Sequence, residues 1–377
     1  MHLHITALVA VCSYGLIYSS ELPLITEKYR KTIPSLVCNG SAELSAKEKA
    51  SLITHYLTGF IPHKKSLAIE GTEQLQNKIK DLIDHEKPLS LLLLGFPFKS
   101  TNHEKKCLSD DVDMGEYLAL TTLNTVVDNI KQIYPHAHCT IISDGLAYHI
   151  EEYDPSYQKI VNYHDQMDKL TQLFDHVSFI SWNINGTLSS YNQLQAYVDQ
   201  TLCNDDKKNT IRIKEMSSFV KNEFESTNWQ AFFLQQAEDE YNKTGSTIKP
   251  KLKAQEIKTL KNKLIMQKIS CVVPELIKKG KQFSTLVSQI YPNYNECIRL
   301  SVHCDKNNPD ISCKIPIALI YGHYGTPWHN TMVINQDDEL KGFAKDIYKK
   351  QLDLSLKPKK EYSVKTNETL NVAYITF

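Results

Sequence analysis

The sequence predicts an α/β fold in which helices flank a mostly parallel sheet. Two short, continuously apolar runs, at 91–94 and 139–142, are typical of strands that are buried on both faces. Between them, apolar residues recur at helical spacing from Leu118 to Ile133, and the pattern stops at Tyr134 and Pro135. A strand, a helix and a second strand in this order indicate a parallel β-α-β unit. We therefore expect a Rossmann-like sheet.

The length of the chain and its changes in character divide it into five parts. A chain of 377 residues holds two domains, or one domain with a substantial insertion. We expect an N-terminal apolar leader or extension at 1–40, an α/β core at 41–202, a helical insertion at 203–285, a C-terminal part of the core at 286–345 and a tail at 346–377.

The elements of the first half follow from hydrophobic spacing and from the positions of glycine and proline. A helix is expected at 41–57, with Ser41 as its N-cap and Gly59 after its end, and a second helix at 72–85. After the β-α-β unit we expect a helix at 157–173. A strand at 177–182 follows, which ends at the Asn185-Gly186 turn.

Beyond residue 203, lysine-rich helical patterns replace the alternation of strands and helices. Residues 243–281 hold eleven lysines and two glutamates, and their apolar stripe is narrow. One interpretation is a solvated helical insertion, and the other is a rim that attracts anions. Further strands that complete the sheet are expected at 298–303, 314–320 and 325–334.

The composition is that of a globular protein without a preferred charge. Lysine plus arginine and aspartate plus glutamate number 43 each, so no overall field favours nucleic acid or a membrane as a partner. Nine cysteines show no Cys-x-x-Cys spacing, which favours a reduced, cytoplasmic protein. Residues 3–17 are almost uncharged, so the alternative is a secretory signal or anchor at 1–20. No lysine or arginine precedes this run, and it is short for a membrane span.

Polar residues follow both strands of the β-α-β unit at the point where each strand ends. Lys99 and Ser100 come after the first strand, and Ser143 and Asp144 come after the second. The carboxyl ends of parallel strands meet at one edge of the sheet, where open α/β sheets bind their ligands. We therefore expect these residues to line a site. For Lys99 the alternative is a surface charge, and for Asp144 it is a turn residue.

Asp113 and Glu116 lie three residues apart at the start of the helix that follows the first strand. This spacing places both carboxylates on the first turn of the helix. They serve either in a site or only as caps that offset the helix dipole.

Four other residues have the chemistry of a site. Arg299 and Lys314 fall inside strand patterns, where an unpaired cation is costly to bury, so each needs a carboxylate or a phosphate. His303 and His329 are the histidines best placed for acid–base chemistry. We expect no metal, because the histidines and cysteines lack the usual ligand spacings. The sequence also lacks the common dinucleotide, nucleotide, esterase and zincin motifs.

Taken together, these residues form five motifs, which are Gly95-Phe96-Pro97-Phe98-Lys99-Ser100, Asp113-Met114-Gly115-Glu116, Ser143-Asp144-Gly145, Ile298-Arg299-Leu300-Ser301-Val302-His303 and Thr326-Pro327-Trp328-His329-Asn330. In this order they resemble the pyoverdine/dityrosine biosynthesis family, the isocyanide (isonitrile) synthases. The resemblance covers roughly residues 89 to 335, with the lysine-rich stretch as an insertion.

The resemblance implies an enzyme of secondary metabolism that converts the α-amino group of an amino acid, commonly tyrosine or tryptophan, into an isonitrile. The carbon donor would be ribulose 5-phosphate, and no cofactor is expected. The alternatives are an enzyme that forms an N-formyl amino acid, as in dityrosine synthesis, or an inactive protein that binds the amino acid or the sugar phosphate. A downstream oxygenase that acts on the isonitrile is an expected partner.

Such chemistry needs cations that hold a phosphate dianion and groups that move protons. The expected catalytic residues are His303, His329, Asp144 and Glu116. The expected substrate-binding residues are Lys99, Ser100, Asp113, Ser143, Arg299, Lys314 and Trp328. Lys99, Arg299 and Lys314 would hold the phosphate and the amino acid carboxylate, and Trp328 would either wall an aromatic pocket or pack in the core.

Overall fold

The computed structural model describes residues 24–36, 44–61, 69–103, 106–143, 145, 157–181, 213–214, 216–218, 220–221, 223–244, 250–302, 314–323, 325–335, 337, 339–343, 363–367 and 372–376. The apolar N-terminal run at 1–20 and the expected turn at Asn185-Gly186 lie outside these residues.

Five parallel strands form the central sheet in the order β3-β2-β1-β4-β5. In chain order they are β1 (Leu89–Leu94), β2 (Ala137–Ile142), β3 (Val177–Ile180), β4 (Ile298–Ser301) and β5 (Ile315–Pro316). β1 is the middle strand and is almost completely buried, as its continuous apolar run predicts. The expected α/β fold with a parallel sheet is confirmed.

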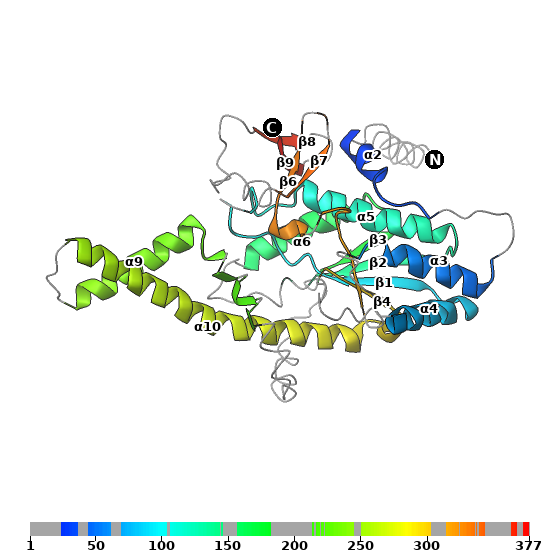
Figure 1. Ribbon diagram of the computed structural model, residues 1–377, viewed down its shortest axis with the longest axis horizontal. Coiled ribbons are helices and arrows are strands. Elements are labelled where there is room, and N and C mark those ends of the chain that lie inside the picture. The colour runs from blue at the N-terminus through cyan, green and yellow to red at the C-terminus, as the bar shows by residue number, and fades with distance from the viewer. Residues whose placement is uncertain are drawn as a thin grey trace, which may run out of the picture.

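Helices cover both faces of this sheet, and Figure 1 shows α5 and α10 on opposite sides of it. α5 (Met114–Lys131) connects β1 to β2, and α6 (Tyr157–Thr171) lies against β3. Leu91 and Leu93 of β1 join the main apolar core with Leu120 of α5, whereas Leu92 packs in a separate cluster with Leu286 of α10. Successive residues of a strand point to opposite faces, so β1 is apolar throughout because both of its faces are covered.

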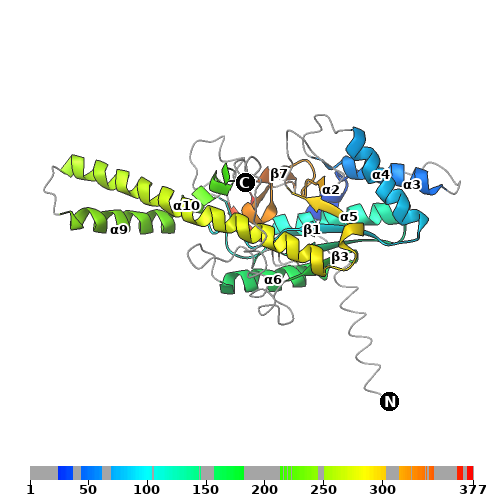
Figure 2. The same ribbon diagram turned by 90° about the horizontal axis from the view of Figure 1, so that it is seen from below.

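The lysine-rich stretch is helical, as expected, and contributes to two regions of the molecule. α9 (Thr227–Lys243) packs along the first half of α10 (Pro250–Ile290), and Figures 1 and 2 show this pair extending away from the sheet. We call α9 together with residues 250–264 the helical arm. It has a small apolar core of its own, made by Ala237, Tyr241 and Ile257. The second half of α10 returns to the sheet and packs on Leu92 and Ile142.

A second, four-stranded sheet has the order β7-β6-β9-β8. Its strands are β6 (Met332–Ile334), β7 (Leu340–Phe343), β8 (Ser363–Asn367) and β9 (Val372–Thr376). The expected strand at 325–334 is therefore shorter than its apolar pattern suggested, and it joins this second sheet instead of the parallel one. Residues 327–329 form a 3₁₀ turn, because Pro327 at its first position cannot donate a ladder hydrogen bond.

Among the described residues, three helices precede β1, namely α2 (Leu24–Arg30), α3 (Ala46–Thr58) and α4 (Ile69–Asp84). The expected N-cap of α3 at Ser41 is wrong, since Ser45 caps this helix. The Ser45 hydroxyl accepts a hydrogen bond from the Glu48 amide, and the Glu48 carboxylate accepts one from the Ser45 amide. This reciprocal pair is a capping box, and it fixes the start of the helix at Ala46.

None of the helices in the described parts of the chain combines the length and the apolar character that a membrane crossing requires.

Candidate functional site

The site lies at the carboxyl edge of the parallel sheet, where the strand order reverses. The chain leaves β1 through α5 to β2 on one side, whereas β4 lies on the other side of β1. Such a reversal opens a crevice at the carboxyl ends of the two strands, which is the usual ligand position in open α/β sheets. The loop that follows β1 carries the first of the five motifs. Phe96 in this loop has a φ of 56°, a left-handed conformation that is uncommon for a residue with a side chain.

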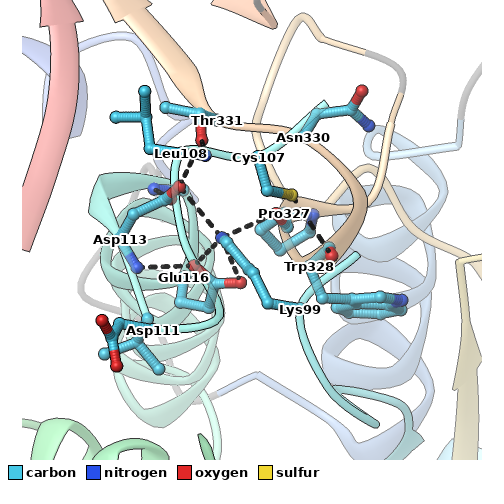
Figure 3. A network of polar contacts seen from close by, with 12 residues as sticks. Lys99, Cys107, Leu108, Asp111, Asp113, Glu116, Pro327, Trp328, Asn330 and Thr331 are labelled. Carbon is cyan, nitrogen blue, oxygen red and sulfur yellow. Dashed lines mark hydrogen bonds and ion pairs between the residues drawn. The ribbon is translucent and has the colours of Figure 1, made fainter. Parts of the chain in front are cut away.

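At the centre of the site, Lys99 lies between two carboxylates (Figure 3). Its ammonium nitrogen is 2.5 Å and 2.7 Å from the two Glu116 oxygens and 3.0 Å from Asp113 Oδ2, and it donates to the Pro327 carbonyl at 3.0 Å. The Lys99 and Glu116 side chains are fully buried. Tyr163 of α6 also donates to Glu116, at 3.1 Å. We call Lys99, Asp113 and Glu116 the buried charge cluster.

The same two carboxylates cap α5. Asp113 is the N-cap and accepts a hydrogen bond from the Gly115 amide at 2.7 Å, while Glu116 accepts one from the Asp113 amide at 2.9 Å. The helix start thus holds both carboxylates in place, and Lys99 neutralises part of their charge. Capping and ion pairing, which the sequence presents as alternatives, therefore occur together.

Burial and charge shift the proton equilibria of this cluster. Burial alone would lower the pKa of the Lys99 ammonium, but the carboxylates of Asp113 and Glu116 outweigh burial and raise it. Burial raises the pKa of Glu116 to about 7, with Asp113 adding to the effect and Lys99 opposing it. The pKa of the Tyr163 phenol is raised well above its usual value, first by burial and then by Glu116. The cluster therefore contains a lysine that stays protonated and a carboxyl group that titrates near neutral pH.

The segment around Trp328 closes the cluster from the other side. The Trp328 carbonyl accepts from the Ser100 amide at 2.8 Å, and the Thr331 hydroxyl donates to Asp113 at 2.8 Å. The Trp328 ring is buried and packs on Phe96 with a centroid distance of 4.7 Å. Trp328 thus forms part of the core beneath the motif loop, one of the two roles expected for it.

Ser143 lies at the end of β2 in a separate buried network. Its hydroxyl lies 2.9 Å from the Phe96 carbonyl, to which it donates, and 2.6 Å from His164 Nε2. His164 Nε2 also lies 2.9 Å from the Pro97 carbonyl, and its Nδ1 lies 2.9 Å from the Ser181 hydroxyl. A carbonyl can only accept, so the proton of the neutral ring is on Nε2 and Ser181 donates to Nδ1.

This second network holds the buried His164 in place and fixes the turn after β1. Burial lowers the pKa of His164 to about 4, although the Pro97 carbonyl acts in the opposite direction. Glycine is the only residue type that fits at position 145, because a Cβ there would lie 2.1 Å from the Pro97 carbonyl oxygen. Ser143 and Gly145 thus allow the loops after β1 and β2 to meet.

Ser100 points away from the buried charge cluster and donates to Glu223, at 2.7 Å and 2.9 Å from its two oxygens. Glu223 comes from the segment just before the helical arm and is buried. The structure therefore brings a residue of the lysine-rich region into contact with the motif loop.

Three other expected site residues, Arg299, Lys314 and His329, lie within the described parts of the chain. Arg299 pairs with Leu92 in the sheet, and its guanidinium lies 4.9 Å above the Tyr294 ring. Lys314 is exposed just before β5, and His329 Nδ1 lies 2.9 Å from the Thr326 hydroxyl. Asp144 and His303 lie outside the described residues.

Sequence reasoning missed several residues that contact the motif loops or the buried charge cluster, among them Tyr163, His164, Glu223 and Thr331. Tyr163 and His164 fall inside an expected amphipathic helix, and Glu223 falls in the lysine-rich region, so no local pattern marks them. The one available signal was that a buried lysine and a buried turn each need polar partners. As for metals, no three His, Cys, Asp or Glu side chains gather as possible ligands within the described ranges.

The chain is similar in sequence to known proteins of one family. Residues 79–355 match the family model described as pyoverdine/dityrosine biosynthesis protein. Two L-tryptophan isonitrile synthases of Fischerella ambigua, AmbI2 and AmbI1, are 24% and 26% identical to this chain, over 68% of it and over 72% and 74% of their own lengths. The isocyanide synthase xanB of Aspergillus fumigatus is 24% identical over 81% of this chain and 40% of its own length.

A solved structure shares the fold. The PvcA protein of Pseudomonas aeruginosa matches with a TM-score of 0.56 and 16% identity, over 87% of this chain and 99% of its own. The family-model match at residues 79–355 spans all five motifs and all of the buried charge cluster. The chain belongs to the pyoverdine/dityrosine biosynthesis protein family and is an enzyme of the isocyanide synthase class.

Proposed function

We propose that this enzyme converts the α-amino group of an aromatic amino acid, tryptophan or tyrosine, into an isonitrile and takes the added carbon from ribulose 5-phosphate. Two of the relatives act on L-tryptophan according to their names. Ribulose 5-phosphate is a cytosolic metabolite, which favours a cytoplasmic enzyme. An oxygenase that consumes the isonitrile is the partner we propose.

The observation that carries this proposal is the buried charge cluster. Condensation of an amine with a ketone needs a neutral amine, and the later steps need removal of a proton next to the imine. A carboxyl group with a pKa of about 7, such as Glu116, is matched to proton transfer at neutral pH. Glu116 is therefore the proton acceptor of the site, and Lys99 stabilises its carboxylate form.

The contacts of Lys99 give it a different role from the phosphate ligand expected from the sequence. An ammonium group has three protons, and four oxygens of Glu116, Asp113 and Pro327 already lie within 3.0 Å. We therefore propose that Lys99 stabilises the two carboxylates and that other cations bind the phosphate.

Arg299 is the better phosphate ligand. It is half-buried on the strand next to β1, and its Nε has no hydrogen-bond partner among the described residues. Its guanidinium lies above the Tyr294 ring, which orients it without neutralising its charge. A guanidinium binds phosphate or carboxylate in a bidentate manner. Lys314, His303, His329 and Asp144 remain proposed site residues with the roles given above.

The test uses the whole chain with tyrosine or tryptophan and ribulose 5-phosphate that carries ¹³C at the transferred carbon. Mass spectrometry should find the label in an isonitrile or in the formamide that its hydrolysis yields. Unchanged amino acid across a panel of amino acids would contradict the proposal.

The phosphate assignment has its own test. Arg299→Met should raise KM for ribulose 5-phosphate roughly tenfold or more, as expected for a lost charge-assisted contact, and should change KM for the amino acid little. Arg30→Met removes an exposed arginine of α2 and is the matched control. An equal rise in both KM values would remove the assignment.

A further inference from the structure

Glu223 is a buried carboxylate that none of the five motifs contains. Its two oxygens accept from the Ser100 hydroxyl at 2.7 Å and 2.9 Å and from the Thr101 hydroxyl at 3.4 Å, and it forms an ion pair with Lys106. The Glu223 side chain is 2% exposed and that of Lys106 is 12% exposed. Three residues of the loop after Lys99 thus converge on one carboxylate.

The neighbours of Glu223 in the chain hold it from the side of the helical arm. Phe224 is buried in the main apolar core and packs on Trp229 and Phe233 of α9, with centroid distances of 4.7 Å and 5.3 Å. Gln230 donates to the Phe224 carbonyl at 2.6 Å. The start of α9 therefore holds the backbone next to Glu223, while the Glu223 carboxylate contacts the loop.

From the loop, hydrogen bonds continue to the buried charge cluster. The Ser100 amide donates to the Trp328 carbonyl, and the Thr331 amide donates to the Lys106 carbonyl, both at 2.8 Å. The Thr331 hydroxyl then donates to Asp113 at 2.8 Å. A continuous set of contacts thus runs from Glu223 through the loop and through Thr331 to the partner of Lys99.

We propose that Glu223 is a positioning residue through which the start of the helical arm holds the loop that carries Lys99 in its working geometry. The inference rests on the proposed function for its effect on turnover. The arm is then part of the catalytic apparatus, although its outer end lies away from the sheet.

The first test compares Glu223→Gln with Glu240→Gln, which removes an exposed carboxylate of α9. A displacement of about 1 Å at a reacting group costs roughly 10²-fold in rate, so kcat of Glu223→Gln should fall by about this factor while both KM values change less than threefold. The control should keep the kcat of the wild type. A normal kcat per folded molecule in Glu223→Gln would overturn the proposal, since a merely structural residue lowers only the amount of folded enzyme.

The second test does not depend on turnover. Hydrogen exchange of the full chain without substrate should show faster exchange of the Ser100 and Thr331 amides in Glu223→Gln than in the wild type, and no change in Glu240→Gln. Unchanged protection at both amides would overturn the positioning role. If the wild type forms no isonitrile, the proposed function fails, and hydrogen exchange still decides the role of Glu223.

A smaller change covers the case in which Glu223→Gln does not fold. Ser100→Ala removes one hydroxyl and leaves the ion pair of Glu223 with Lys106 intact. It should lower kcat roughly tenfold, the effect of about one lost hydrogen bond. A folded Ser100→Ala enzyme with unchanged kcat would count against the proposal.

Discussion

At the scale of single residues, the site depends on a charge balance among buried side chains. Lys99 is one cation facing two carboxylates, and all three side chains are almost completely buried. Removal of one partner from such a cluster leaves charges that nothing compensates, which is more damaging than the loss of a surface pair.

Lys99→Met should therefore destabilise the protein strongly and abolish turnover. Breaking a buried ion pair costs about 3–5 kcal/mol, which urea unfolding measures. The matched control is Lys80→Met, which breaks an exposed pair with Asp84 and should cost less than about 1 kcal/mol. Equal effects of the two changes would show that burial does not set the strength of the Lys99 pairs.

His164 should make stability depend on pH. Its pKa is lowered from 6.5 to about 4, so the unfolded chain takes up a proton at a higher pH than the folded chain does. The contribution of the neutral His164 to the free energy of unfolding is fully present above pH 6.5 and is lost as the pH falls towards 4. It amounts to roughly 3 kcal/mol at most, since one pKa unit corresponds to about 1.4 kcal/mol.

Urea unfolding at pH 7 and at about pH 4.5 measures this loss. His164→Gln should be less stable at pH 7 and should lose less stability between the two pH values than the wild type does. Parallel pH curves for the two proteins would show that His164 is not responsible.

The sequence identifies some site residues and not their partners. The motifs identify Lys99, Asp113 and Glu116 as site residues. Their spacing in the sequence does not show that the loop lysine contacts the first turn of α5. Glu223 and Tyr163 could not be found, because a polar residue in a helical pattern is ordinarily solvated. Contacts between segments that are distant in the chain are decided by tertiary packing.

At the scale of elements, α10 has two different halves. Near its start, Leu252 is 51% exposed on the helical arm, whereas Leu286 near its end is 6% exposed and packs beneath Leu92 of β1. The same helix is therefore exposed at its start and joins the core in its later part.

Leu286→Ala should cost about 2–5 kcal/mol of unfolding free energy, as for other buried leucines. Leu252→Ala on the same helix should change it by less than about 0.5 kcal/mol, since its side chain is mostly exposed. Chemical denaturation of both variants checks this pair. A large effect of Leu252→Ala would indicate that its side chain is covered in solution.

The elements that the sequence predicts correctly are those with a clear apolar pattern. The runs at 91–94 and 139–142 become β1 and β2, because a continuous apolar run fits a strand that is covered on both faces. Residues 327–329 form a 3₁₀ turn instead of a strand, and their apolar character comes from packing beside Phe96. Which sheet β6 joins depends on β7 and β9, which no local pattern reveals.

At the scale of the whole molecule, stability should differ between the sheet and the helical arm. The arm is held by a small cluster around Tyr241, whereas β1 and β2 lie in the main core. Regions with few buried apolar contacts open locally at lower free energy. Amides of α9 should thus exchange faster than those of β1.

Tyr241→Ala should speed exchange throughout the arm and leave β1 and β2 protected as in the wild type. Hydrogen exchange followed by mass spectrometry measures both regions in one experiment. Faster exchange in β1 as well would show that the arm and the sheet unfold as one unit.

The pairing of β6 with β9 has a consequence for how the enzyme is made. β6 begins directly after Thr331, and its parallel neighbour β9 comes from residues 372–376, about forty residues later in the chain. During synthesis on the ribosome, the sheet beside the site stays incomplete until this late segment has left the exit tunnel. A chain that is read only to residue 370 would lack β9, so β6, which begins next to Thr331, would have no parallel neighbour.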